Sequence, residues 1–141
     1  MKRSGLAVIT ILLVLGATSA LFASDGIFPK PISSELPMYP ERARSARVAG
    51  TVKIWFMLDG SGAVAQAQSI SGNPMLRDAA VSTVKSWKFL TNSVQANVRY
   101  ETEFVYVLTV QPKNGEPKLT VSMTDFRRVE IVSERYAEAI E

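Results

Sequence analysis

The chain has 141 residues, of which 47% are hydrophobic, and this balance predicts one folded domain with room for a tail or a targeting segment. It contains no cysteine and no histidine, which excludes disulfides, thiolate metal sites and Ser-His or Cys-His catalysis. The formal net charge is +3, but without Lys2 and Arg3 the remaining 14 basic and 13 acidic residues nearly balance, so nothing predicts nucleic-acid binding.

Residues 1–23 have the layout of a secretory signal peptide. Lys2 and Arg3 precede an uncharged run whose strongly apolar part, Leu6 to Leu15, is short and is followed by small residues. The whole uncharged run, residues 4–24, is also long enough to cross a bilayer as an uncleaved anchor. On either interpretation we expect the rest of the chain to lie outside the cytoplasmic membrane, with membrane contact only through this segment.

A linker and a short helix are expected next. Residues 24–38 contain three prolines and little periodicity, which indicates an extended linker. Residues 39–48 predict a short helix with Pro40 at its first position, and Gly50 ends it. We expect the folded domain to span residues 39–110 and a C-terminal extension to span residues 111–141.

The first strand is predicted over residues 50–58, where apolar residues from Val52 to Leu58 alternate with a mixed face. The next residues, Asp59 to Gly62, are typical of a hairpin turn, because Asp-Gly between two runs of strand composition is a strong hairpin signal. A calcium loop would need further acidic ligands, and a phosphate loop would need a following helix and a nearby basic residue. This part of the sequence offers neither.

The clearest helix signals lie in residues 72–89. Asn73 is a suitable N-cap, and Pro74 suits the first turn. The predicted apolar stripe consists of Leu76, Ala80, Val84 and Trp87. We expect Trp87 to be a core residue.

After the second predicted strand, residues 63–71, residues 98–108 predict a third strand that places Glu101 and Glu103 on one face. These acids could serve a small carboxylate-dependent hydrolase, but no nucleophile, oxyanion donor set or metal ligand accompanies them. We favour a solvated strip next to Lys53 on a neighbouring strand.

The C-terminal extension predicts short strands at residues 118–123 and 127–133, then a frayed helix over residues 134–141. The expected fold class is therefore α+β. A small antiparallel sheet of three strands plus this hairpin would carry two helices.

Several motifs together resemble the C-terminal domain family of TonB, the periplasmic energy transducer. They are Tyr-Pro, an Ala three residues after the Pro, Gly-x-Val, Asp-x-x-Gly-x-Val, Ser-Gly, Leu-x-x-Ala-Ala and Trp-x-Phe, within residues 37–110. The matching positions are Tyr39, Pro40, Ala43, Gly50, Val52, Asp59, Gly62, Val64, Ser71, Gly72, Leu76, Ala79, Ala80, Trp87 and Phe89. The resemblance implies a three-stranded antiparallel sheet with two helices. Each residue also has a structural reason for its place, so the motifs support fold more directly than function.

Functionally, the resemblance implies a non-catalytic module that binds a partner protein, such as an outer-membrane transporter in energy transduction, without cofactor or metal. A transporter segment would pair with the edge of the third strand by β-augmentation. The contact residues carried over from the family are Arg44, which follows the Tyr-Pro motif, and Val98, Tyr100, Thr102, Phe104, Val105, Tyr106 and Val107.

The C-terminal extension leaves an alternative open. A hairpin from Lys118 to Ser133 could pair with the third strand and occupy the docking edge itself. The protein would then be a stand-alone structural domain whose tail caps its own edge. As a further option, the domain could form a homodimer through that edge. Residues 24–39 also reach only about 50 Å when extended, which is short for the periplasm-spanning spacer of TonB.

Overall fold

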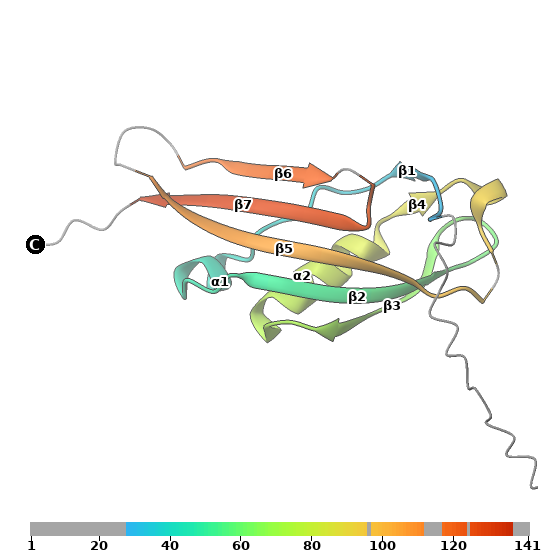
Figure 1. The fold of residues 1–141 in the computed structure, drawn as a ribbon, viewed down its shortest axis with the longest axis horizontal. Helices are drawn as coiled ribbons and strands as arrows, with labels where there is room; N and C mark the ends of the chain where they lie inside the picture. Colours follow the sequence, from blue (N-terminus) through green and yellow to red (C-terminus); the bar gives the residue numbers. More distant parts are fainter. Residues whose placement is uncertain (1–27, 96, 112–116, 124, 137–141) are drawn as a thin grey trace, which may run out of the picture.

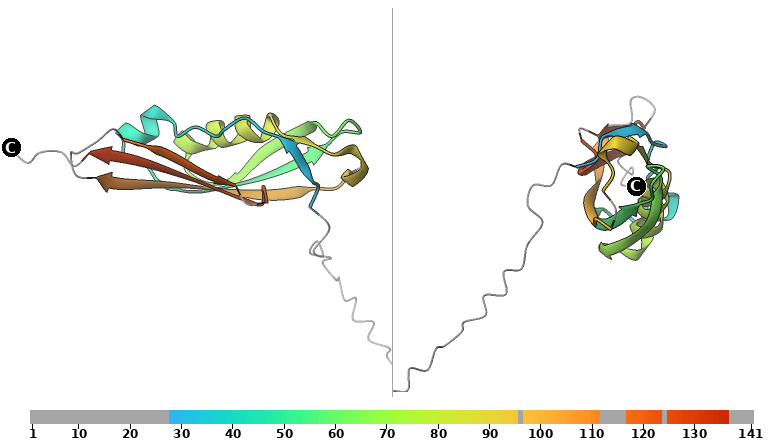
Figure 2. Two further views of the ribbon diagram at one scale, coloured as in Figure 1. Left: turned by 90° about the horizontal axis from the view of Figure 1, so that it is seen from above. Right: turned by 90° about the vertical axis from the view of Figure 1, so that its right-hand side faces the viewer.

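The computed structural model describes residues 28–95, 97–111, 117–123 and 125–136. Its elements are β1 (Pro31–Ser33), α1 (Glu41–Ser45), β2 (Gly50–Leu58), β3 (Val64–Ser71), α2 (Pro74–Lys85), β4 (Lys88–Phe89), the 3-10 helix η1 (Thr91–Ser93), β5 (Tyr100–Gln111), β6 (Leu119–Met123) and β7 (Arg128–Tyr136). These described residues form a five-stranded sheet with the order β3-β2-β5-β7-β6 and a small sheet of β1 and β4. Both α-helices lie on one face of the large sheet (Figure 1), as the turned views also show (Figure 2). The expected α+β class is confirmed.

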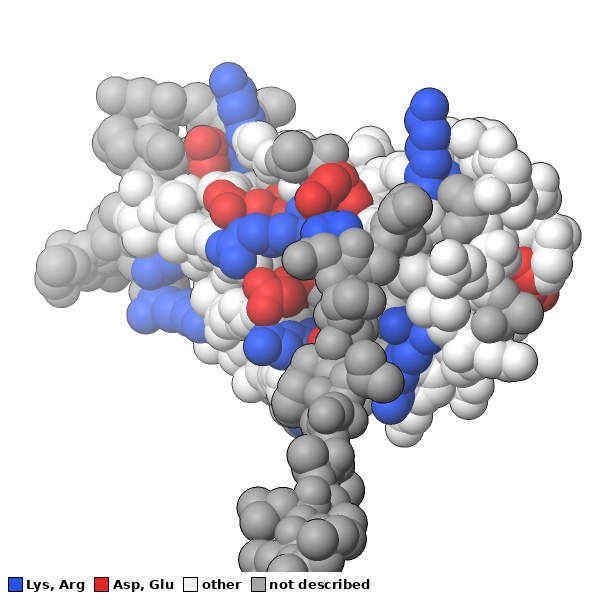
Figure 3. Space-filling model, turned by 45° about the vertical axis from the view of Figure 1, so that its right-hand side comes forward, with Lys and Arg blue, Asp and Glu red and all other residues white. Residues whose placement is uncertain are grey.

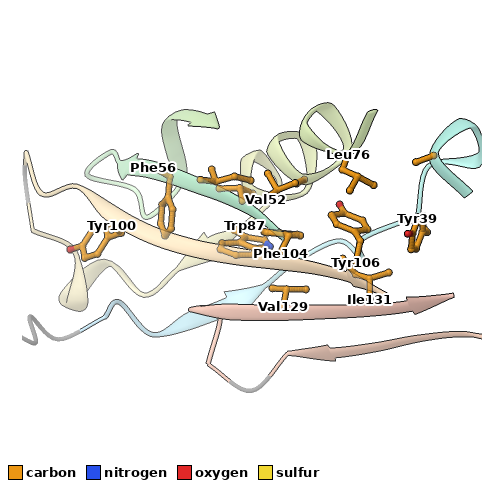
Figure 4. Close-up of a cluster of buried hydrophobic side chains, with 14 of the residues drawn as sticks. Tyr39, Val52, Phe56, Leu76, Trp87, Tyr100, Phe104, Tyr106, Val129 and Ile131 are labelled. Atoms are coloured by element: carbon orange, nitrogen blue, oxygen red, sulfur yellow. The ribbon is translucent and has the colours of Figure 1, made fainter. Parts of the chain in front are cut away.

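The core lies between the sheet and α2, and the alternation of β2 explains its position. Val52, Ile54 and Phe56 on one face of β2 are fully buried. The Trp87 ring lies above the neighbouring strand β5, stacked on Phe104 with 5.8 Å between ring centroids (Figure 4). An aromatic layer thus joins the sheet to the helix side, and each buried ring removes a large apolar area from water.

Helix α2 begins and packs as its sequence predicts. The Asn73 side chain accepts a hydrogen bond of 2.9 Å from the Met75 backbone N–H, and Pro74 is the first helical residue. All four members of the predicted stripe, including Trp87 just beyond the helix, are completely buried. Helix α1 is shorter than expected and covers only Glu41–Ser45.

The Asp59–Gly62 segment is a turn between β2 and β3, as predicted. The Asp59 carboxylate accepts hydrogen bonds from the Ser61 N–H (2.8 Å), the Ser61 hydroxyl (2.6 Å) and the Ala63 N–H (3.2 Å). These donors, those of Ser61 first, lower the pKa of Asp59 because they stabilise its charged form. The acid therefore organises the turn.

Residues 28–38 differ from the expected linker because they pack on the domain. The Phe28 ring lies edge-on to Phe56, with 6.0 Å between centroids, and β1 pairs with β4. The Leu90 N–H donates to the Lys30 carbonyl at 2.9 Å, which ties the segment down further. One aromatic anchor and a short strand pair suffice here, and neither produces a periodic pattern in the sequence.

The C-terminal extension adds two strands to the large sheet, and β7 lies between β5 and β6. β7 is parallel to β5, whereas β6 is antiparallel to β7, so the sheet is mixed and not purely antiparallel as expected. β7 continues to Tyr136, so residues 134–136 are strand where a helix was expected. Residues 137–141 lie outside the described residues.

The expected signal or anchor, residues 1–23, also lies outside the described residues. Within the part of the chain that the structure describes, no helix has the length and apolar character needed to cross a membrane.

Gly62 is a turn position that cannot accept a side chain. Its φ is +81°, and a Cβ there would lie 2.0 Å from the Phe89 carbonyl oxygen. We expect Gly62→Ala to lower the free energy of unfolding by about 2 kcal/mol or more, measured by urea denaturation with Trp fluorescence. Gly60→Ala in the same turn is the control, because a Cβ there meets nothing within 4 Å. Equal losses for the two variants would contradict this account of the turn.

The two faces of β7 supply a second comparison. Ile131 is completely buried, whereas its neighbour Val132 lies half-buried on the outer face of the sheet. We expect Ile131→Ala to cost about 2–5 kcal/mol of unfolding free energy and Val132→Ala about 1 kcal/mol or less. If thermal and urea unfolding gave equally small losses of unfolding free energy for both variants, β7 would be a peripheral addition and not part of the core.

Candidate functional site

The strand expected to offer a free edge, β5, lies inside the sheet. β2 pairs with one side of it, and β7 pairs with the other side in parallel, from Glu103 opposite Arg128 to Gln111 opposite Tyr136. The expectation that residues 98–108 hold a vacant docking edge is therefore wrong from Glu103 onward. The reason is that the protein's own C-terminal strand already uses these backbone groups.

The bend before β7 closes the start of this edge as well. The Glu103 N–H donates to the Arg127 carbonyl at 2.8 Å, and the Thr102 hydroxyl donates to the Phe126 carbonyl at 2.6 Å. The Phe126 ring lies against Trp87, with 4.6 Å between centroids. The hairpin is thus held both by the backbone of β5 and by the core beneath it.

The residues predicted to contact a partner are divided between the two faces of β5. Those that point into the core, each at most 7% exposed, are Tyr100, Thr102, Phe104 and Tyr106. Val105 and Val107 are half-buried on the outer face, and Val98 packs at the border of the core. The structure does not bring these side chains together at an accessible edge.

The tyrosine of the Tyr-Pro motif has a structural role. The Tyr39 hydroxyl donates to the Val48 carbonyl at 2.6 Å, and its ring lies edge-on to Tyr106, with 5.2 Å between centroids. Burial raises the pKa of both phenols, and for Tyr106 the nearby Tyr39 adds to the effect. These tyrosines therefore stay neutral and fasten the start of the domain to β5.

Glu101 and Glu103 lie on the outer face of the sheet. The Glu103 carboxylate lies 3.5 Å from the Lys53 ammonium and 3.2 Å from the Arg128 guanidinium, while Glu101 is exposed. Acidic and basic side chains gather on this side of the molecule (Figure 3). The interpretation as a solvated strip next to Lys53 is confirmed, and such exposed pairs contribute little stability each.

With β5 enclosed, the described part of the large sheet ends at β3 on one side and at β6 on the other. The pairing of β3 with β2 is irregular, with register shifts next to Ile54 and next to Leu58. Such bulges twist an edge away from further strand pairing. The pairing of β6 with β7 runs without a shift from Leu119 to Met123. β6 is therefore the regular open edge.

The backbone direction along β6 follows from one hydrogen bond. The Glu134 N–H donates to the Lys118 carbonyl at 3.0 Å, so the backbone of residue 118 faces β7. Because facing alternates along an antiparallel strand, the N–H and C=O groups of Leu119, Val121 and Met123 point away from the sheet. They form the candidate docking edge.

The side chains of this edge are uncharged. Val121 and Met123 pack against the core, and Leu119 is 48% exposed. Thr120 and Ser122 are exposed on the outer face. Natural edge strands commonly carry a charge, a proline or a bulge that prevents pairing, and residues 119–123 have none of these.

Arg44, the remaining predicted contact residue, lies near one end of β6. A shallow hollow of about 250 Å³ separates α1 from the start of β6, and its lining includes Arg44, Pro117, Glu134 and Arg135. The Arg44 guanidinium forms an ion pair with Glu41 on its own helix. Among the described residues that were predicted as contacts, only Arg44 lies beside this end of β6.

Sequence reasoning identified residues 118–123 as a strand but did not identify them as the open edge. The available signal was the uncharged run between Lys118 and Asp125, with hydroxyl side chains alternating with apolar ones. An uncharged run indicates an unprotected edge only if the strand is known to be outermost in the sheet. Here β6 is outermost because β7 lies between β5 and β6.

Comparison with known proteins identifies the family of the chain. The family model for the Gram-negative bacterial TonB protein C-terminal region matches residues 35–108, more than half of the chain. The protein TonB of Salmonella typhimurium is 31% identical over 75 residues, which cover 52% of this chain but only 31% of that protein. The solution NMR structure of the Pseudomonas aeruginosa TonB C-terminal domain is 20% identical with a TM-score of 0.43, covering 60% of this chain and 88% of that one. The chain belongs to the TonB C-terminal domain family.

Proposed function

We propose that this protein is a non-catalytic binding module that takes up an extended segment of a partner protein as an additional strand beside β6. The observation that carries the proposal is the regular, uncharged outer edge of β6, together with the closure of the β5 edge by β7. Main-chain hydrogen bonds supply the affinity in this mode of recognition, and side chains at alternate positions supply the selectivity.

Binding at β5 itself would require removal of β7, and the core opposes that. Val129 and Ile131 of β7 are completely buried, and the Ser133 side chain is only 1% exposed. Stripping β7 from the sheet would uncover these residues together with the face of Phe104. A guest strand at β5 would have to offset the hydrophobic cost of that exposure, whereas a guest at β6 would not.

The C-terminal hairpin therefore moves the docking edge outward by two strands. β7 covers β5 from Glu103 to Gln111. Because β7 is parallel to β5, the chain must first run back along the sheet, and β6 is this return segment. As the outermost strand it presents a fresh edge. This proposal joins both expectations, because the tail closes one edge and provides another.

The proposed partner is the periplasm-facing segment of an outer-membrane transporter, as family membership suggests for a domain of this kind. The proposed location, outside the cytoplasmic membrane, is supported by the signal-like pattern of residues 1–23. The hollow beside Arg44 lies at one end of the β6 edge and would receive the end of a bound segment. Its lining carries both charge signs, which suits a polar chain end.

The direct test uses a proline at an outward-facing position. Val121→Pro removes an N–H that points away from the sheet, so the pairing with β7 is kept while a guest strand loses a donor. We expect synthetic peptides of periplasm-facing transporter segments to bind the wild-type protein. Val121→Pro should weaken this binding at least tenfold in a fluorescence-anisotropy titration.

The control proline belongs on the opposite edge. The Glu103 N–H faces β7, so its partner on β2, Lys53, directs its backbone groups toward β3. Trp55, two residues on, does the same and pairs with Gln68 of β3. The backbone groups of the next residue, Ala67, therefore point away from the sheet. Ala67→Pro should leave the peptide affinity unchanged. The proposed site would be overturned if Val121→Pro left peptide binding intact, or if only Ala67→Pro abolished it. If the wild-type protein bound no transporter segment, this partner would be excluded.

A further inference from the structure

We propose that the β6 edge also pairs with β6 of a second copy of this chain, in antiparallel fashion about a two-fold axis through Val121. This inference rests on strand addition at β6 as the proposed function, and it names a partner for that same edge. The resulting dimer joins the five-stranded sheets of two copies into one continuous sheet.

The first support is that the order of apolar and hydroxyl side chains along β6 is the same from either end. The strand is Leu-Thr-Val-Ser-Met, an apolar and hydroxyl alternation that is symmetric about its centre. A two-fold axis through Val121 places Leu119 opposite Met123 of the second copy, and Thr120 opposite Ser122 of the second copy. Apolar side chains then meet on the core face and hydroxyl groups meet on the outer face. A self-complementary patch of this kind is what a two-fold interface requires.

The second support is the direction of the backbone. The N–H and C=O groups that point outward belong to Leu119, Val121 and Met123. In the proposed register, these are the residues that face one another across the axis. Each facing pair is therefore of the hydrogen-bonded type, in which two residues exchange both of their backbone hydrogen bonds.

Neighbouring registers are less favourable. Shifting the axis to Thr120 brings Met123 opposite Pro117, which has no N–H to donate. Shifting it to Ser122 brings Leu119 opposite Asp125, beyond the end of β6. A shift by half a residue would turn apolar side chains toward the solvent face. The register centred on Val121 alone aligns the whole of β6 with itself.

The third support is the charge at the two ends of the paired strands. Lys118 precedes β6 and Asp125 follows it, and both are exposed. The antiparallel arrangement brings the basic start of β6 in one copy to the same end of the interface as the acidic residue after β6 in the second copy, at both ends. Opposite charges near one another at the surface attract modestly, and salt screens this attraction. Leu119, 48% exposed in the single chain, becomes covered by Met123 of the second copy.

The dimer competes with a guest segment because both need the same backbone groups. A five-residue strand gives a small interface, and small interfaces are weak and transient. The dimer is thus a reversible cover for the edge, which a transporter segment displaces by mass action.

The test is sedimentation equilibrium of the exported protein, from about 1 to 500 μM, with two charge variants. The double variant T120K/S122K places lysine opposite lysine across the axis, and T120E/S122K places glutamate opposite lysine. Both variants share S122K, so any effect of that change on the neighbouring Glu130 of β7 is common to them. Like charges directly opposite one another weaken strand pairing, and opposite charges strengthen it.

We expect the wild-type protein to dimerise reversibly, T120K/S122K to raise the dissociation constant roughly tenfold or more, and T120E/S122K to restore dimerisation. The difference between the variants should shrink in 1 M salt, because the introduced charges are exposed. Val121→Pro, which removes a central donor, should leave a monomer.

Three outcomes would overturn the dimer. They are a wild-type protein that stays monomeric throughout this range, equal loss of dimerisation in both double variants, and dimerisation that is indifferent to Val121→Pro. A monomer that still binds transporter peptides in a Val121-dependent way would reject the dimer and keep the proposed function. If the protein formed the dimer with the expected charge dependence but bound no peptide, the dimer would be kept and the proposed partner rejected.

Discussion

The parallel pairing of β7 with β5 is the interaction on which the rest of the structure depends. It provides partners for backbone groups of β5 from Glu103 to Gln111, and it places Val129 and Ile131 in the core. Unpaired backbone groups and uncovered apolar side chains are each costly, and β7 removes both at once. The C-terminal extension is therefore an integral part of the sheet, and its strand order, with β7 inside and β6 outside, sets the accessible edge of the domain.

Closing one edge of an open sheet always creates another. In this chain the new edge is β6, which is short, uncharged and regular, whereas β3 at the far side is bulged and lies alongside α2 (Figure 1). The same physical property, a row of outward N–H and C=O groups, would serve both the proposed guest segment and the proposed second copy. Their concentrations and the register that each achieves would then decide which of them occupies the edge.

Local signals in the sequence predicted the local structure well. The Asp-Gly turn, the Asn73 cap, the buried face of β2 and the core position of Trp87 all depend on neighbouring residues, and all are confirmed. The motif spacing likewise identified the family. These features are readable because a turn, a cap or an apolar stripe is encoded within a few residues.

Long-range features were not readable in the same way. The alternation around Ile131 predicted a strand, but nothing local shows that this strand pairs in parallel with β5 and leaves β6 outside. Phe28 likewise joins the core from a proline-containing segment without periodicity. The position of an open edge depends on strand order, so the sequence alone predicts it at β5, and the spatial arrangement places it at β6.

Amide hydrogen exchange, resolved by NMR at low protein concentration, tests the central claim most directly. The alternation turns the N–H groups of Glu103, Val105 and Val107 toward β7 and that of Val121 toward solvent. The account predicts exchange of the three β5 amides only through global unfolding, and exchange of the Val121 amide orders of magnitude faster. Rapid exchange of the three β5 amides in the folded protein would show that β7 leaves the sheet, and would contradict the account.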